Sequence, residues 1–195
     1  MPGTAKRKEK KRGGPILVRV TKGVYTVPMD YSIRPATEAD FGGMWEIFRE
    51  VIKDGTTYVF APETREEDAR AYWFAPGVSS YVAEDRGWIL GMYRLVANQR
   101  DLGSHVANAS FMVAPGQQGR GIGTALGRHC LVEAKKAGYS AMQFNFVVSS
   151  NEAAVGLWKK LGFAIVGTLP GAFRHATLGF VDAYVMYRFL DDVSA

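Results

Sequence analysis

The sequence predicts an α/β domain built on a mixed, mostly antiparallel sheet flanked by helices. Three observations support this fold class: β-rich segments dominate the start, a strand-loop-helix unit occupies the middle, and two more β-rich segments close the chain. The chain has 195 residues, 47% of them hydrophobic and 12% aromatic, which is the composition of a globular protein with a sizeable core. One compact domain is therefore expected.

The N-terminal residues differ in charge from the rest. Residues 1–12 contain six lysines and arginines and one glutamate, a net charge of +5 that equals the charge of the whole chain. We expect a basic, disordered tail over residues 1–14, a β extension over 15–30 and the main domain over 31–195. A basic tail could contact nucleic acid or anionic lipid, but the neutral body has no basic stripe to support it. Nucleic acid is therefore not an expected partner.

Cysteine usage and hydropathy indicate the cytoplasm. The single cysteine, Cys130, can form neither an internal disulfide nor a Cys-rich metal site, which agrees with a reducing compartment. No segment approaches the roughly 20 apolar residues of a membrane-spanning helix, and the apolar run after the basic N-terminus is too short for a signal peptide. No histidine pair has ligand spacing, so no metal site is expected.

Helix caps and turn residues locate the elements of the first half. A Thr-x-x-Asp pattern at 37–40 offers side-chain oxygens to the free amides of a helix, and a Thr-x-x-Glu pattern at 64–67 does the same. Residues 85–87 lie between two β-rich segments and predict a hairpin turn. The expected elements are a strand from Tyr31, a helix from 37–40 to a stop at 54–55, a helix from 64–67 to about 76–77, and strands over 80–84 and 88–96.

The second half follows the same rules. Gly138 ends a segment with helical apolar spacing, and either Ser150 or Asn151 can cap the next helix. The expected elements are a strand over 105–113, a helix over 122–136, a strand over 141–148, a helix after 150 or 151, and strands over 163–169 and 180–189.

A glycine-rich loop precedes the helix over 122–136. Four glycines fall between 116 and 123, where they permit backbone conformations closed to other residues. Because the first turn of a helix has unpaired N–H groups and the positive end of the dipole, such a loop is suited to an anion, and Arg120 adds a charge beside it. The loop is not a Walker A motif, which needs a following Lys-Ser or Lys-Thr pair. It is not a dinucleotide fingerprint either, because Leu126 stands where the third glycine is needed.

Two blocks of sequence resemble one family. The pattern Gln118-x-x-Gly121-x-Gly123 is similar to the pyrophosphate loop of the GCN5-related N-acetyltransferase superfamily, and residues 151–163 resemble its later Asn-x-x-Ala…Leu-Gly-Phe segment. The resemblance covers about residues 31–190, and it implies splayed central strands and acetyl-coenzyme A as cosubstrate. It also implies a cofactor site composed of Val113, Gln118, Gly119, Arg120, Gly121, Ile122, Gly123, Thr124 and Asn151.

Two asparagines are the candidate catalytic residues. Asn108 and Asn145 lie on the expected strands before and after the loop helix, although asparagine is a poor strand former. By resemblance these strands part to admit the cofactor, so the two amides could polarise the thioester carbonyl or hold the acceptor. Satisfying backbone groups left by the splay is the open alternative. The string 144–151 with Trp158 also resembles a subgroup of fungal-type acetyltransferases that act on proline analogues.

Trp158 departs from the family pattern. Many members place a tyrosine seven residues after the matching asparagine to protonate the leaving thiolate. Here the residue is tryptophan, whose indole N–H cannot act as an acid near neutral pH. Trp158 also falls on an apolar helical stripe, so packing is its expected role.

Four residues are candidates for binding the acceptor. By resemblance, the region between the first two helices walls the acceptor site, which makes Tyr58 and Phe60 candidates, with packing at the edge of the core equally open. Phe173 and His175 precede the last strand and could cover the acceptor, against ordinary loop or strand roles.

The expected function is transfer of an acetyl group from acetyl-coenzyme A to the amine of a small molecule, such as an amino acid or an analogue, by direct attack. Cofactor binding without catalysis and acetylation of a peptide or protein are the alternatives. A homodimer is among the expected oligomeric states, since small domains of this kind often pair.

Overall fold

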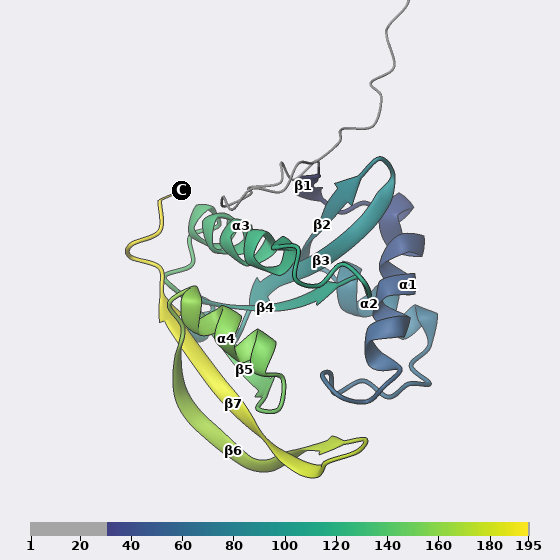
Figure 1. The fold of residues 1–195 in the computed structure, drawn as a ribbon. Coiled ribbons are helices and arrows are strands. Elements are labelled where there is room, and N and C mark those ends of the chain that lie inside the picture. Colours follow the sequence, from purple (N-terminus) through teal and green to yellow (C-terminus); the bar gives the residue numbers. More distant parts are fainter. Residues whose placement is uncertain (1–30, 195) are drawn as a thin grey trace, which may run out of the picture.

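Seven strands form one mixed sheet in the order β1-β2-β3-β4-β5-β7-β6 (Figure 1). The computed structural model describes residues 31–194, so the expected tail over 1–14 and β extension over 15–30 lie outside the described residues. Neighbouring strands are antiparallel except for β4 and β5, which are parallel. The predicted fold class is confirmed. The strands are β1 (Ser32–Pro35), β2 (Ser79–Asp85), β3 (Trp88–Ala97), β4 (Val106–Val113), β5 (Ala141–Val148), β6 (Ala164–His175) and β7 (Gly179–Phe189).

Helices cover both faces of the sheet (Figure 1). Because side chains alternate along a strand, Met92 of β3 packs into a core with α1 and α2, while its neighbour Tyr93 packs into a core with α3 and α4. Both side chains are fully buried. The α-helices between residues 31 and 194 are α1 (Phe41–Ile52), α2 (Glu66–Phe74), α3 (Ile122–Lys136) and α4 (Glu152–Lys160), with short 3₁₀ helices η1 (Glu38–Asp40) and η2 (Asp101–Gly103).

The two parallel strands separate soon after they meet. β4 and β5 pair only through Val106 with Ala141 and Ala107 with Met142. Beyond these pairs the strands diverge, and β5 continues with β7 and β6 as a separate wing (Figure 1). The splay implied by the family resemblance is therefore present, and it exposes backbone edges that would otherwise be paired.

The start of the first helical segment agrees with the capping pattern in the sequence. One carboxylate oxygen of Asp40 accepts hydrogen bonds from the backbone N (2.7 Å) and the hydroxyl (2.9 Å) of Thr37. The guanidinium of Arg34 donates to both oxygens of the same carboxylate, at 2.7 and 2.8 Å. The hydrogen bonds from Arg34 are the main reason that the pKa of Asp40 lies well below its usual value.

The predicted cap of the second helix is wrong. α2 begins after Arg65, and no side chain there caps the free backbone amides of the first turn. Thr64 instead donates its hydroxyl to the carbonyl of Ala61 at 2.6 Å, which closes a local turn. Three acidic residues in the first turn, Glu66 to Asp68, complement the helix dipole in place of a cap.

Strand β6 is longer than predicted. The sequence suggested an end at residue 169, but the strand continues through Pro170 and Gly171 to His175. β6 lies at the edge of the sheet, where a proline lacking its N–H costs no ladder bond, and its pairing with β7 shifts register between Leu169 and Phe173. Phe173 and His175 therefore belong to a strand and not to a loop.

Candidate active site

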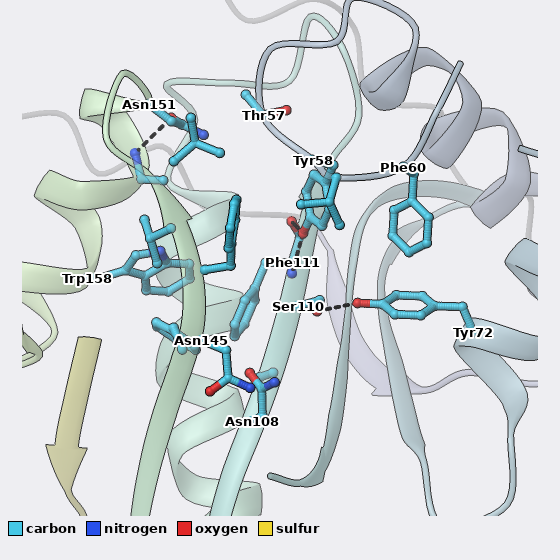
Figure 2. A pocket seen from close by; sticks show the side chains of 17 residues that line it. Thr57, Tyr58, Phe60, Tyr72, Asn108, Ser110, Phe111, Asn145, Asn151 and Trp158 are labelled. Carbon is cyan, nitrogen blue, oxygen red and sulfur yellow. Dashed lines mark hydrogen bonds between the residues drawn. The ribbon is translucent and has the colours of Figure 1, made fainter. Parts of the chain in front are cut away.

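Two connected cavities open where β4 and β5 separate. The small cavity has a volume of about 260 Å³ and is lined by 57–60, Tyr72, 108–111 of β4, 144–148 of β5, and Asn151, Ala154 and Trp158 (Figure 2). The groove has a volume of about 770 Å³ and extends from the end of α1 across 111–113 and the glycine loop to α4. Six residues line both, and they mark the junction: Thr57, Tyr58, Phe111, Asn151, Ala154 and Trp158.

The glycine loop presents free amides to the groove. Gly116, Gly119 and Gly121 all have positive φ, at 78°, 75° and 80°, which lets the chain wrap before α3 begins. The bond from Ala125 N to Gly121 O (3.0 Å) is the first of the helix, so the amides of residues 122–124 have no partner within α3. Together with the positive end of the helix dipole, these groups suit a diphosphate.

The structure places all but one of the predicted cofactor residues on the groove. Val113, Gln118, Gly119, Asn151 and residues 121–124 line it. Arg120 does not; its guanidinium donates to the side-chain oxygen of Gln117. The charge of Arg120 therefore acts beside the loop and not on the lining surface.

Asn151 caps α4 at the junction of the two cavities. Its side-chain oxygen accepts a hydrogen bond from the backbone N of Ala154 at 3.1 Å, so the prediction of an asparagine cap is confirmed (Figure 2). Because an amide carries two donor hydrogens on its nitrogen, capping leaves the NH₂ group of Asn151 available to a bound molecule.

Tyr58 holds the exposed edge of β4. Its hydroxyl donates to the carbonyl of Phe111 (2.5 Å) and accepts from the backbone N of the same residue (3.0 Å), as Figure 2 shows. These are backbone groups that β5 would pair with if the strands had not separated. Burial raises the pKa of the Tyr58 hydroxyl, so it remains protonated.

The small cavity is aromatic and uncharged. Rings of Phe60, Tyr72, Phe111, Phe144 and Trp158 form its walls, and none of its lining residues is acidic, basic or histidine. The hydroxyl of Tyr72 and the Oγ of Ser110, 2.5 Å apart, supply polar atoms on one side (Figure 2). Such a cavity fits a compact molecule with apolar parts and few polar groups.

Comparison with known proteins places the chain in a family. Residues 45–163 match the acetyltransferase (GNAT) family. The chain belongs to the GNAT family of acetyltransferases. It is an N-acetyltransferase with a GNAT fold, as its residue patterns predicted.

The relatives agree with this assignment. A GCN5-related N-acetyltransferase from Kribbella flavida is 41% identical and superposes with a TM-score of 0.80 over 84% of this chain and 99% of its own. The L-amino acid N-acyltransferase MnaT of Escherichia coli (strain K12) is 29% identical over 145 residues, 71% of this chain and 83% of the relative. The protein yncA from Salmonella typhimurium, solved with its cofactor acetyl-CoA, shares the fold at 24% identity, with a TM-score of 0.73 over 85% of this chain and 97% of its own.

The two candidate asparagines of this acetyltransferase both line the small cavity but differ in their partners (Figure 2). Asn145 accepts from the side chain of Gln143 (2.7 Å) and donates to the side-chain oxygen of Asn98 (2.6 Å). The amide of Asn108 has no hydrogen-bond partner among residues 31–194 and is free to bind. The alternative that they satisfy backbone groups is not what the structure shows, since Tyr58 does so at Phe111 and Asn145 bonds to side chains.

The remaining acceptor candidates reach the site to different degrees. Tyr58 and Phe60 line the small cavity. Phe173 lines neither cavity. Its ring centroid lies 6.3 Å from that of Phe146, and Phe146 lines the small cavity. His175 is farther along the β6–β7 hairpin, where its Nδ1 accepts from the backbone N of Thr177 at 3.2 Å and so stabilises the turn.

Three carboxylates, those of Glu50, Asp54 and Glu152, line the groove, whereas two histidines and the cysteine lie away from both cavities. His105, His129 and Cys130 line neither cavity. His129 belongs to α3, and its half-buried ring packs against Tyr81 and Tyr93, with Nδ1 2.8 Å from the hydroxyl of Tyr93; burial lowers its pKa. Within residues 31–194 no three His, Cys, Asp or Glu side chains gather as metal ligands. No helix in the same range is long and apolar enough to cross a membrane.

The sequence did not single out several wall residues. Tyr72, Ser110 and Phe111 line the small cavity without matching any motif, and Phe146 lies within the string 144–151 but was not itself a candidate. The signals that could have marked them are a serine and two aromatic residues within strand-like segments. These signals are weak, because such residues also occur in ordinary cores. Their convergence depends on contacts between positions 38 and 53 residues apart.

Proposed function

We propose that this N-acetyltransferase transfers an acetyl group from acetyl-coenzyme A to the amine of a small amino acid or a close analogue by direct attack. One observation carries the proposal: a groove with free helix-start amides meets a small uncharged cavity between two splayed strands. Such a junction brings a carrier held on one side within reach of an amine held on the other.

The carrier would be held by the chain's own backbone. The amides from about Gly119 to Thr124 would bind its diphosphate, the open edge of β4 near Val113 would pair with its pantetheine arm, and Asn151 would contact it at the junction. Acetyl-coenzyme A supplies the thioester that makes the acetyl group transferable. The acetyl-CoA of yncA supports this choice for a chain of the same fold.

The acceptor would be compact and would react as a neutral amine. A cavity of about 260 Å³ with aromatic walls accommodates an amino acid more readily than a peptide chain. Because no lining residue is a carboxylate or a histidine, the amine proton would leave to water and not to a side chain. The name of MnaT, an L-amino acid N-acyltransferase, supports this class of acceptor, and the resemblance of the string 144–151 with Trp158 to fungal-type enzymes adds proline analogues to the compounds to test.

A nearby cation supports an acceptor that carries a carboxylate. The guanidinium of Arg94 lies 4.0 Å from the ring centroid of Tyr72, a wall residue of the small cavity. Among residues 31–194 no carboxylate pairs with Arg94, and its side chain is only half-buried. Its charge is therefore available to attract an acid group toward the Tyr72 wall.

The asparagines would act on the reactants. We assign the free amide of Asn108 to hold the acceptor or to polarise the thioester carbonyl. Asn145, which is held by hydrogen bonds to Gln143 and Asn98, would have the same role from β5. Phe60 and Tyr58 would shape the acceptor side, while Phe173, which packs against Phe146, and His175, which stabilises the turn, would contribute through the β6–β7 hairpin.

A product screen tests the proposal. The full chain is incubated with acetyl-coenzyme A and a mixed pool of amino acids, cyclic analogues, polyamines and peptides, and acetylated products are identified by mass spectrometry. We expect small amino acids or their analogues to dominate. Coenzyme A binding by calorimetry without any product would instead support a binding module, and dominance of polyamines or peptides would contradict the acceptor class. The cytoplasmic location and the homodimer remain predictions that fractionation and sedimentation can check.

A further inference from the structure

Trp158 occupies the junction between the groove and the small cavity. Its side chain is only 7% exposed, yet it lines both cavities. Its ring is fixed between those of Phe111 and Phe144, each with a centroid 4.7 Å away. A β-carbon on Gly127 would lie 3.3 Å from the same ring, so this glycine lets α3 and α4 approach and holds the indole in place. The expected packing role of Trp158 is confirmed. Packing explains the position of the ring but gives no role to its polar N–H group.

The indole N–H of Trp158 has no hydrogen-bond acceptor in the described part of the chain. An N–H that is sealed from water and has no acceptor is costly, whereas one that borders a cavity can donate to a bound molecule. Among residues 31–194, one side-chain N–H is both fully buried and without a hydrogen-bond partner. It is the indole N–H of Trp73, a residue that lines neither cavity. The indole N–H of Trp158 differs because it is not fully buried. Since Trp158 lines both cavities, its N–H is accessible from them. Figure 2 shows the indole facing the cavity with no bond drawn to it.

We propose that the indole N–H of Trp158 donates a hydrogen bond to the sulfur of coenzyme A as the acetyl group leaves. The inference rests on the proposed function. In the reaction a C–N bond forms between the amine and the acetyl carbon, the C–S bond breaks, and its electron pair stays on sulfur. The amine proton passes to water, and the thiolate later takes a proton from water. The indole stabilises the charge on sulfur and keeps its own proton, because it is a donor only.

The position of Trp158 supports this role over that of a carbonyl donor. A carrier in the groove and an amine in the small cavity would meet at the residues that line both, so the thioester would lie there. At this junction Asn151 also offers an NH₂ group, while Tyr58 is fully used by the backbone of Phe111. The indole thus replaces protonation of the leaving group with a hydrogen bond to it.

Binding of coenzyme A and desulfo-coenzyme A, which lacks the sulfur, tests the inference without turnover. By calorimetry on the full chain, at a pH where the thiol of coenzyme A is ionised, we expect the wild type to bind coenzyme A about tenfold more tightly than desulfo-coenzyme A. Trp158→Phe keeps the packing and should lose this preference. Trp73→Phe removes a buried indole N–H that lines neither cavity and should retain it.

The outcomes separate this inference from the proposed function. If the wild type binds neither compound, the proposed function fails and the inference with it. If it binds both equally, or if Trp158→Phe keeps the tenfold preference, the inference alone is overturned. Should Trp158→Phe fail to fold, ¹⁵N-tryptophan labelling of the wild type decides: one of the four indole N–H resonances must shift with coenzyme A and not with desulfo-coenzyme A.

Kinetics provide a second readout. In Trp158→Phe we expect kcat to fall about tenfold with little change in KM for acetyl-coenzyme A, since the charge develops only in the transition state. Trp158→Tyr introduces a titratable donor, so kcat of that variant should fall at a pH near its phenol pKa, about 10, where the wild type shows no such loss. If kcat of the wild type also fell at high pH, and Trp158→Phe kept that fall, another titrating group would protonate the leaving sulfur and the assignment would be contradicted.

Discussion

Single side chains complete the hydrogen bonding that the splayed sheet leaves unfinished. The hydroxyl of Tyr58 bonds to both backbone groups of Phe111, while that of Tyr72 bonds to the side chain of Ser110 on the same strand. The sequence predicted Tyr58 as a wall of the acceptor site but not this bond, because the partner lies 53 residues away and no local pattern marks it. Roles of this kind emerge only when the fold brings distant positions together.

The two cavity asparagines can be separated by substitution. Asn108→Ala and Asn145→Ala should each lower kcat/KM for the acceptor about ten- to a hundredfold, the rough scale for a lost donor to a developing charge. Asn98→Ala is the control, because it removes the partner of Asn145 and leaves both asparagines in the cavity. Steady-state kinetics on the amine found in the product screen measures all three. If Asn98→Ala is as damaging as Asn145→Ala, then Asn145 serves structure and not catalysis.

At the scale of elements, the predictions succeeded where local chemistry decides and failed where the environment does. α3 has the predicted bounds because a glycine with positive φ lies just outside each end of the helix, Gly121 before it and Gly138 after it. The cap of α2 was misassigned, since Thr64 can bond either to the helix or to Ala61 and sequence does not tell which. β6 was cut short at Pro170 because its edge position, which tolerates proline, is a property of the whole sheet.

The start of α3 is expected to be the determinant of cofactor affinity. Gly121→Glu strains a residue with φ of 80° and adds a negative charge where the diphosphate would bind, so affinity for coenzyme A should fall at least tenfold. Gly138→Glu is a matched control at the other end of the helix, with φ of 87° and open space around it. Both variants should lose about 1–2 kcal/mol of stability. Calorimetry showing equal affinity in the two variants would mean that the loop does not bind phosphate.

The start of α1 should give the protein a pH-dependent component of stability. Because the pKa of Asp40 is lowered by Arg34 in the folded state, its contribution is present above the usual carboxyl pKa of 3.8 and is lost as pH falls toward the folded value. We expect Asp40→Asn to be about 1 kcal/mol less stable at pH 7, the scale of a helix cap partly screened by solvent. Urea unfolding at pH 7 and at about pH 3 measures the difference, which should shrink at the lower pH. A constant difference would exclude the carboxylate charge as the cause.

The whole molecule divides the work between two wings of one sheet. The wing from β1 to β4 carries the phosphate loop, and the wing of β5, β7 and β6 carries Asn145 and the long hairpin (Figure 1). The wings are rejoined on the acceptor side, where the backbone N of Ala176 at the hairpin tip donates to the carbonyl of Gly55 after α1, at 3.1 Å. Neither residue lines the groove, and Phe173 of the same hairpin packs against Phe146, a wall residue of the small cavity.

Cutting that contact should therefore affect one substrate and spare the other. Ala176→Pro removes the N–H that reaches Gly55, whereas Ala176→Gly keeps it and serves as the control at the same position. We expect KM for the acceptor amine to rise several-fold in the proline variant, because the wall of the small cavity loses a support, while the affinity for coenzyme A stays unchanged. Steady-state kinetics with the amine varied, together with calorimetry for coenzyme A, tests both halves. A matching rise in the glycine variant, or weaker coenzyme A binding in the proline variant, would show that the hairpin tip does not act on the acceptor side alone.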